Sequence, residues 1–182
     1  MRVFIRDILG TAIGAIAIFL ILQASLQSSI IIGSSMEPNF EDGQRLLISK
    51  VVYYFREPAR GDVVVFTPPH IQDDEFIKRI IGLPGESVEI KENTVYIYHD
   101  DEVLSLVEQA YIEDPPRYTF SSQTIPASNY FVLGDNRNNS NDSHHGWTVT
   151  SEDIVGTAWL SIWPPDKWGL VPNHSPQEQP ES

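Results

Sequence analysis

A continuous apolar run lies near the start of the chain. Residues 8–26, "ILGTAIGAIAIFLILQASL", carry no charge, and a helix of this length would be about 29 Å long, just enough to cross the hydrocarbon core of a bilayer. Arg2 and Arg6 precede the run. By the positive-inside tendency, they predict that residues 1–7 lie in the cytoplasm and that the rest of the chain lies outside.

Two other interpretations of this run fit less well. A cleavable signal peptide also needs small residues in an Ala-x-Ala-like arrangement before its cleavage site, and residues 22–32 contain no small-x-small pair. A buried core helix is disfavoured because the N-terminal run carries no charge at all. The pattern therefore favours a retained, single-pass membrane anchor over residues 8–26.

Beyond the anchor, the pattern of apolar and polar residues changes to that of short strands. Stretches rich in Val, Ile, Tyr and Phe alternate with Gly, Pro, Asp and Asn, and no segment of comparable length has the apolar spacing of a helix. The pattern predicts a mainly β domain over residues 27–171, an antiparallel-sheet or β-barrel-like fold. The predicted strands are residues 29–33, 45–55, 62–68, 76–82, 87–90, 94–98, 129–134 and 155–163.

The breaks between these strands carry predictions of their own. The tripeptide Lys91-Glu92-Asn93 separates two strands and predicts a hairpin turn, with Asn93 in the left-handed conformation. Residues 100–127 begin with an acidic stretch and are less regular, which indicates an insertion on one side of the sheet. Residues 172–182 are polar and contain proline, so they are predicted to form a disordered tail.

The composition excludes several classes of protein. The chain has 182 residues, of which 41% are apolar, so it can form a substantial core. The net charge of −13 arises entirely after residue 40, since the charges before it cancel. A nucleic-acid partner is therefore not expected, because phosphate binding needs a basic surface. Cysteine is absent, which excludes a disulfide framework, a thiol nucleophile and a thiolate metal site.

Two adjacent serines follow the first predicted strand. Ser34 and Ser35 stand in "IIIGSSMEPNF", residues 30–40, which could be a tight turn with solvated hydroxyls or a turn that presents a nucleophile. The chain has no G-x-S-x-G, S-x-x-K or H-E-x-x-H motif, so the lipase, penicillin-binding and zinc-peptidase interpretations lack their signatures. A base for a nucleophilic serine must therefore come from another part of the sequence.

Two adjacent cations, Lys78 and Arg79, stand inside the apolar strand of residues 76–82. Alternation places them on opposite faces, and each has apolar neighbours on its own face. Guanidinium stays protonated in proteins, whereas a desolvated ammonium can lose its proton. Lowering a lysine pKa from about 10.4 to near 7 costs about 4.6 kcal/mol, which burial can supply. A neutral Lys78 could deprotonate a serine, although a sheet-edge lysine whose amine reaches water fits the same pattern.

A long polar loop follows the strand of residues 129–134. Its sequence, "GDNRNNSNDSHH", spans residues 134–145 and is typical of a turn. Asp135, Arg137 and Asp142 could pair with one another and make it rigid, and Ser140 and Ser143 could form hydrogen bonds with a nearby amine.

The same loop ends in two adjacent histidines. His144 and His145, with Asp142 before them, raise the possibility of a metal site. The sequence disfavours it, because neighbouring side chains project apart and no fourth ligand is evident. No metal and no cofactor are therefore expected.

Three segments together resemble a known family. They are residues 33–38 (GSSMEP), residues 78–85 (KRIIGLPG) and residues 134–143 (GDNRNNSNDS). In order and spacing they are similar to the type I signal peptidases, membrane-anchored Ser-Lys proteases that remove secretory leader peptides. Residues 56–66 (REPARGDVVVF) resemble this family as well, and the likeness extends from the anchor to about Trp163.

The resemblance implies a role for each matching position. Ser35 would be the nucleophile, Lys78 the general base, and Ser140 a hydrogen-bond partner that fixes the lysine amine. Asp142 would take part in a structural ion pair beside the site. The resemblance further implies that the loop is supported by Asp135 and Arg137.

The chain departs from the family pattern at two positions near the site. Gly33 stands where some relatives have a serine whose hydroxyl helps to bind the oxyanion, so the backbone N–H of Ser35 would need another donor beside it. His144 stands where many relatives have arginine. The Asp142 ion pair is therefore expected either to be pH-sensitive or to recruit Arg137 instead.

The expected function follows from the resemblance. A membrane-bound serine endopeptidase would act on secretory preproteins with signal peptides, and its partners would be these preproteins and membrane lipid, with no nucleic acid. The alternative from another class is a catalytically silent, membrane-tethered β module that binds proteins. A related self-cleaving Ser-Lys repressor protease is disfavoured, because the chain has no basic recognition helix.

Overall fold

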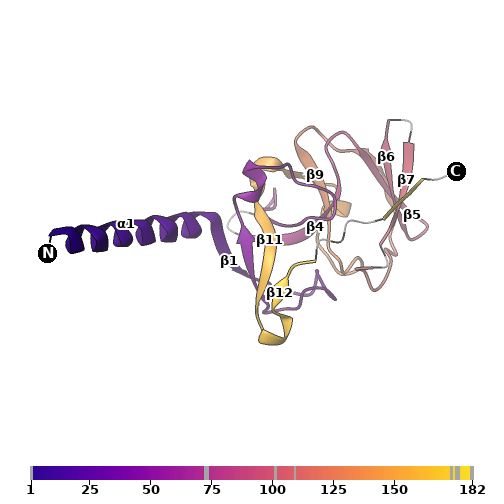
Figure 1. Ribbon diagram of the computed structural model, residues 1–182. Helices are drawn as coiled ribbons and strands as arrows, with labels where there is room; N and C mark the ends of the chain where they lie inside the picture. The colour runs from indigo at the N-terminus through magenta and orange to yellow at the C-terminus, as the bar shows by residue number, and fades with distance from the viewer. Residues whose placement is uncertain are drawn as a thin grey trace.

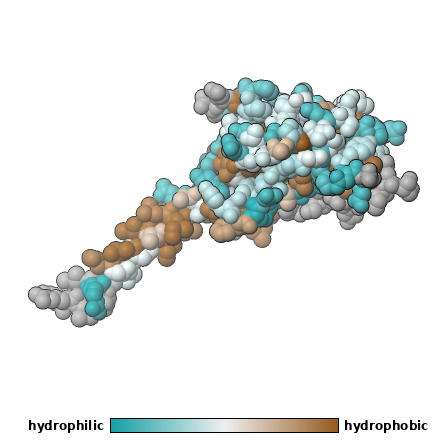
Figure 2. Space-filling view, turned by 90° about the horizontal axis from the view of Figure 1, so that it is seen from above, coloured by the Kyte–Doolittle hydropathy of each residue, from teal (hydrophilic) through white to brown (hydrophobic). Residues whose placement is uncertain are grey.

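The N-terminal helix stands apart from the rest of the molecule. The structure is a computed structural model that describes residues 2–71, 74–100, 102–108, 110–172, 174 and 177–180. Helix α1 (Arg2–Ser25) projects away from the β-domain (Figure 1), and no residue of its apolar stretch Ile8–Ser25 is buried. Figure 2 shows apolar side chains gathered along this helix. By length and composition, the stretch can cross a membrane.

The helix ends where a strand begins. Leu26, predicted as the last residue of the anchor, is the first residue of strand β1 (Leu26–Ile30). The first predicted strand, at residues 29–33, therefore begins earlier and ends before Gly33. The backbone N–H of Ile31 donates to the carbonyl of Gln44 (2.9 Å), so the chain still runs beside its neighbour as it enters the serine turn.

The larger sheet is antiparallel throughout. Its strands follow the order β1-β2-β11-β3-β4-β9-β10, and β12 pairs with β11 outside this path. After β1, the bounds are β2 (Arg45–Ser49), β11 (Ile154–Trp163), β3 (Val63–Phe66), β4 (Phe76–Gly82), β9 (Asn129–Leu133), β10 (Val149–Thr150) and β12 (Gly169–Leu170).

A second antiparallel sheet lies at the end of the molecule far from α1 (Figure 1). Its order is β13-β7-β6-β5-β8. The bounds are β5 (Ser87–Lys91), β6 (Thr94–His99), β7 (Glu102–Val107), β8 (Phe120–Thr124) and β13 (Gln177–Pro180). The prediction of a mainly β, antiparallel fold with one N-terminal apolar helix is confirmed.

Two parts of the second sheet differ from the sequence prediction. Residues 100–127, expected to be an insertion beside the sheet, supply β7 and β8, which pair with β6 and β5. Gln177–Pro180, expected to belong to a disordered tail, form β13 by pairing with β7. Backbone hydrogen bonds to an exposed strand edge can order a polar segment that has no apolar pattern of its own.

Short 3-10 helices interrupt the strands. They are Val52–Tyr54, Ser143–His145, Ser151–Asp153 and Pro165–Lys167. The predicted strand at residues 45–55 is wrong beyond Ser49, because its second half turns into the first of these helices. The predicted hairpin at Lys91-Glu92-Asn93 is confirmed: Glu92 and Asn93 both have positive φ, 50° and 62°, as a two-residue hairpin turn between twisted strands requires.

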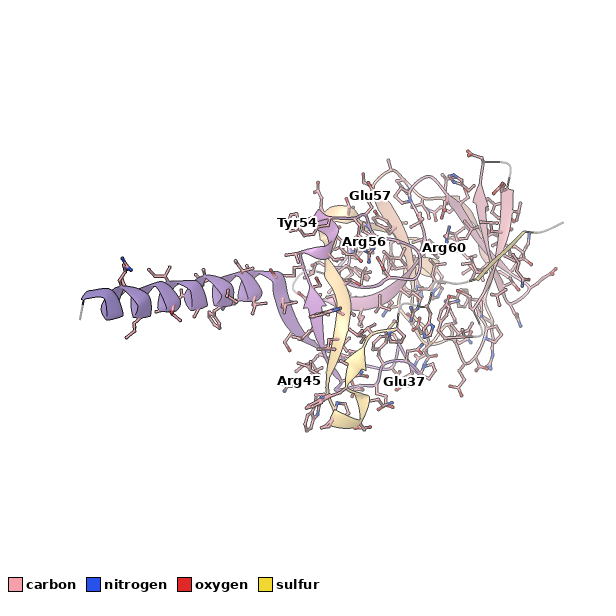
Figure 3. The ribbon with its side chains drawn as sticks, in the orientation of Figure 1. Glu37, Arg45, Tyr54, Arg56, Glu57 and Arg60 are labelled. Atoms are coloured by element: carbon pink, nitrogen blue, oxygen red, sulfur yellow. The ribbon has the colours of Figure 1, made fainter. Side chains whose placement is uncertain are left out.

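The segment "REPARGD", residues 56–62, leads into β3 and is held by two ion pairs. Arg56 donates to both carboxylate oxygens of Asp62 (2.6 and 2.9 Å), and Arg60 pairs with the buried Glu86 (2.7 Å). Figure 3 shows Arg56 on the side of the β-domain near α1 and Arg60 farther from the helix. The Arg56–Asp62 pair lies just before β3 and the Arg60–Glu86 pair reaches the turn after β4, so the two ion pairs hold both ends of the segment that carries β3 and β4.

Three clusters of buried apolar residues meet at β4. Ile81 packs with β5, β6 and β9 in one cluster, Ile80 packs with β3 and β9 in another, and Ile77 lies at the margin of a third that includes residues of β2, β3 and β11. From Lys78 to Gly82 the strand is buried on both faces. Alternation could not identify its interior face because both faces are interior.

Candidate active site

Ser35 lies in a turn that the core holds in place. The turn closes through hydrogen bonds from the Glu37 N–H to the Ser34 carbonyl (3.2 Å) and from the Phe40 N–H to the Met36 carbonyl (3.0 Å). Met36 and Phe40 are buried in the cluster that includes residues of β2, β3 and β11. Met36, directly after Ser35, thus anchors the turn in the core, and the Ser35 hydroxyl is free to contact Lys78.

Lys78 meets this hydroxyl from the centre of the larger sheet. Its Nζ lies 2.6 Å from Ser35 Oγ and donates a second hydrogen bond to the Ile77 carbonyl (2.8 Å). Only 4% of Lys78 is exposed, and its Nζ stands 5.4 Å from the centre of the Phe76 ring. The structure therefore brings together the two residues that sequence analysis expected as nucleophile and base, although they are 43 positions apart.

The two neighbouring cations have opposite surroundings. Arg79 is fully buried and donates to both oxygens of Asp135 (2.8 and 2.7 Å), and its guanidinium lies over the Tyr111 ring. Among the described residues, Lys78 has no carboxylate partner at ion-pair distance. Burial lowers the pKa of Lys78 to about 8, although the charges of Asp142 and Asp135 attract its ammonium. At pH 8 about half of the molecules would therefore carry a neutral amine.

The loop after β9, residues 134–145, forms hydrogen bonds with the turn that carries Ser34 and Ser35. The backbone N–H of Asn136 donates to the Ser35 carbonyl (3.0 Å), and its side-chain amide donates to the Ser34 carbonyl (3.1 Å). Asn139 donates to the Ser34 hydroxyl (3.0 Å). Gly134 passes so close that a Cβ there would lie 2.4 Å from the Ser35 carbonyl oxygen. Sequence analysis missed both asparagines, because in a loop rich in Gly and Asn they look like ordinary turn residues.

Asp135 and Arg137 of this loop pair with residues of other segments instead of with each other. Asp135 accepts from Arg79 and from Asn39 (2.8 Å), and Arg137 forms a buried pair with Glu108. The expected pairing of these charges with one another is therefore wrong, since Asp135 and Arg137 are each neutralised from a neighbouring segment. Glu108 was missed; a lone acid among the apolar residues after β7 was its only signal.

Ser140 does not make its expected contact. Its hydroxyl is buried and forms no hydrogen bond with any described residue. The hydrogen bonds of the Lys78 amine go to Ser35 and to the Ile77 carbonyl instead. Ser140 Oγ faces Gly134, where a Cβ would stand 2.3 Å away.

Asp142 pairs with His144. Its carboxylate is buried and lies 2.6 Å from His144 Nδ1, and it accepts the backbone N–H groups of Gly134 (2.9 Å) and His144 (3.2 Å). Of the two expected partners it therefore engages the histidine, because Arg137 is taken by Glu108. Ser143 instead accepts the backbone N–H of Val132 (3.0 Å) and ties the loop to β9.

The expected oxyanion region contains one uncommitted donor. The N–H of Gly33 already donates to Asp42 (2.7 Å), in a backbone conformation with φ of 87°. The N–H of Ser35 donates to no described residue. Gly33 therefore contributes a turn, while the Ser35 N–H is left available as a donor.

A cleft of about 510 Å³ leads to Ser35 and Lys78. Residues Ser29 to Ile32 line one side, and residues Asp74 to Ile77 line the other. Among the described strands, β1 is the last at its end of the larger sheet, and its residues Ser29 and Ile30 line this cleft. The cleft suits an extended peptide that lies with one of its peptide bonds next to Ser35.

Comparison with known proteins places the chain. A sequence model of the family described as "Signal peptidase, peptidase S26" matches residues 5–163. The chain belongs to this family. It is 40% identical over 153 residues to "Probable signal peptidase I-2" of Synechocystis, which covers 81% of this chain and 68% of the relative. It is 37% identical over 176 residues to "Probable signal peptidase I-1" of the same organism, which covers 92% and 87%.

A further curated relative gives the same result. The chain is 34% identical over 163 residues to "Signal peptidase I T" of Bacillus subtilis, which covers 84% of this chain and 81% of the relative. A solved signal peptidase I from Enterococcus faecalis is 31% identical, with a TM-score of 0.46 over 56% of this chain and 97% of that one. Family membership confirms the prediction of a membrane-anchored peptidase that processes signal peptides, and it sets aside the catalytically silent module.

Proposed function

We propose that the chain cleaves signal peptides from preproteins with Ser35 as nucleophile and Lys78 as general base. The observation that carries this proposal is the 2.6 Å separation between Lys78 Nζ and Ser35 Oγ, with Lys78 only 4% exposed. While protonated, the amine donates to the hydroxyl. After losing a proton it has a lone pair that can accept the hydroxyl proton, which is what a base must do.

Each step of the reaction then has a residue to perform it. Ser35 Oγ attacks the scissile carbonyl carbon while its proton passes to Lys78 Nζ, and the N–H of Ser35 supports the charge that develops on the carbonyl oxygen. Lys78 returns the proton to the leaving amine, which departs as the mature protein. A water molecule that Lys78 deprotonates then hydrolyses the acyl ester and releases the signal peptide.

The substrate would bind as an additional strand. The free edge of β1 and the following residues up to Ile32 offer backbone hydrogen bonds to an extended chain. Phe76, Ile77 and Ile31 supply apolar lining close to Ser35 and Lys78. Shallow apolar pockets of this kind select small side chains at alternate substrate positions, because neighbouring residues of an extended chain point to opposite sides.

The anchor would keep this site near the outer membrane surface. Residues 1–7, with two arginines, would lie in the cytoplasm and the β-domain on the opposite side. Ser35 follows the end of α1 at Ser25 by ten residues, so it can stand no more than about 35 Å of extended chain from the bilayer. Contact with membrane lipid through α1 would thus bring the enzyme to the place where leader peptides end.

Replacing the lysine tests the proposal. Lys78→Met keeps much of the apolar stem and removes the base, so cleavage of a leader-bearing precursor by detergent-solubilised protein is expected to fall by about 10²–10⁴-fold. Lys91→Met is the matched control, because Lys91 is an exposed hairpin lysine and its loss should leave the rate nearly unchanged. Circular dichroism checks that both variants stay folded. A folded Lys78→Met variant with normal cleavage would contradict the assignment.

A further inference from the structure

The two histidines at the end of the active-site loop converge with Asp142. Sequence analysis expected adjacent histidine side chains to project apart. In the 3-10 helix Ser143–His145 they instead lie together, with ring centres 3.8 Å apart. One ligand atom from each of Asp142, His144 and His145 lies within 4.8 Å of the other two. A tight 3-10 turn, followed by Gly146 in the left-handed conformation, produces this convergence.

Two of the three side chains are already held in place. The Asp142 carboxylate is fully buried and is fixed by the backbone N–H groups of Gly134 and His144. The His144 ring stacks on Tyr118 with ring centres 4.2 Å apart and planes 23° from parallel. His145 is exposed, so solvent reaches the cluster from its side. A buried anionic ligand, a fixed imidazole and an accessible imidazole together form a partly preorganised set of donors.

We propose that Asp142, His144 and His145 form a binding site for a divalent transition-metal ion of the Zn²⁺ class. Imidazole nitrogens and a carboxylate oxygen are donors that suit Zn²⁺, while Mg²⁺ and Ca²⁺ prefer oxygen alone. Tetrahedral Zn²⁺ holds neighbouring donors roughly 3.3 Å apart. The 2.6 Å contact between Asp142 and His144 would widen to admit the ion, and the exposed His145 ring would turn inward.

The site adjoins the catalytic pair through Asp142. The charge of this carboxylate acts on Lys78 across the loop, and its second oxygen holds Gly134, which touches the serine turn. An ion on Asp142 would offset that charge. Binding of the ion to this site is therefore expected to alter the rate of precursor cleavage.

Calorimetric titration of the untagged full-length chain with Zn²⁺ tests the site. The protein would be solubilised in detergent, freed of metal with a chelator, and titrated in excess Mg²⁺ to occupy sites made of carboxylates alone. We expect one Zn²⁺ per chain, and His145→Ala is expected to weaken binding by about tenfold or more while leaving cleavage without Zn²⁺ unchanged. Binding of Co²⁺ should give visible absorption bands that the same variant lacks.

His99→Ala is the matched control. His99 is also an exposed histidine next to an aspartate, Asp100, but it lies on β6, outside the cluster. Its replacement should leave Zn²⁺ affinity unchanged. Absence of Zn²⁺ binding, or equal affinity in the wild type and His145→Ala, would overturn the proposal, as would an equal loss in His99→Ala. Bound Zn²⁺ that leaves the cleavage rate unchanged would overturn the link to the active site.

Discussion

At the scale of single residues, Lys78 and Arg79 show how neighbouring cations in one strand acquire different chemistry. The arginine is fully buried but meets a carboxylate, the Gly61 carbonyl and an aromatic ring, so its charge is compensated. The lysine is buried nearly as deeply with a hydroxyl and a carbonyl as hydrogen-bond partners. Desolvation without an ion-pair partner makes an ammonium acidic. Arg79 thus keeps a compensated charge, whereas the pKa of the Lys78 amine is lowered by burial.

Gly134 gives a prediction at this scale. A methyl group there would stand 2.3 Å from Ser140 Oγ and 2.4 Å from the Ser35 carbonyl oxygen, so the loop or the serine turn must shift. Gly134→Ala is expected to lower kcat for precursor cleavage by at least about tenfold and to destabilise the fold by about 1–3 kcal/mol. Enzyme assays and urea unfolding measure the two effects. Gly14→Ala is the control, because a methyl group there meets nothing within 4 Å, and it should change neither kcat nor stability. Similar effects of the two substitutions would contradict the close approach of Gly134 to the serine turn.

Ser35 and Lys78 could be named from sequence because they stand in motifs that resemble those of the family, and the structure brings their side chains together. Their roles as nucleophile and base stay a prediction. The partners of the supporting residues could not be foreseen. Glu108 reaches Arg137 across 29 positions, and no local pattern encodes a contact of that kind. The contact of Ser140 depends on a side-chain rotamer, which a sequence does not specify.

At the scale of elements, the buried pair of Arg137 and Glu108 joins the active-site loop to the segment after β7. Both side chains are at most 4% exposed, so removing one charge leaves the other buried and uncompensated. Glu108→Gln is expected to cost about 3–5 kcal/mol of stability in chemical unfolding. Asp114→Asn is the control, because the pair of Asp114 with Arg117 is exposed and should be worth less than about 1 kcal/mol. Equal costs for the two variants would refute a bracing role.

The elements themselves followed the sequence pattern unevenly. The strands of residues 76–82 and 94–98 and the hairpin before the latter could be predicted, because alternation and turn residues are local signals. Residues 45–55 read as one strand because their apolar character continues, yet the chain turns at Ser49 into Val52–Tyr54. Strand β7 depends on pairing with β6, β8 on pairing with β5, and β13 on pairing with β7, so tertiary hydrogen bonds override their weak pattern.

At the scale of the whole molecule, the chain consists of an exposed apolar helix and a β-domain that carries the site. This division could be read from sequence, because an uncharged run of this length contrasts with the acidic remainder. The arrangement of the β-domain as two sheets (Figure 1) could not, since strand order depends on long-range pairing. Ser35 and Lys78 both lie within the β-domain.

Removing residues 1–25 should therefore leave the cleavage reaction intact while abolishing attachment to the membrane. Helix α1 buries none of its apolar stretch, so the truncated protein is expected to cleave a short soluble peptide with kcat/KM within about threefold of the full chain. Cleavage of a precursor in lipid vesicles should fall more than about tenfold, because the anchor no longer concentrates enzyme at the bilayer. Equal losses on both substrates would show instead that the helix supports the active site.

The titration of the Lys78 amine tests the central claim most directly. Lysine labelled with ¹³C at Cε can be followed by NMR as pH is raised, and the Lys78 signal is assigned by its absence in Lys78→Met. Burial is expected to place this pKa at about 8, with precursor cleavage rising over the same range as the amine becomes neutral. A Lys78 amine that titrates near the ordinary lysine value of about 10.4 would contradict its role as the base.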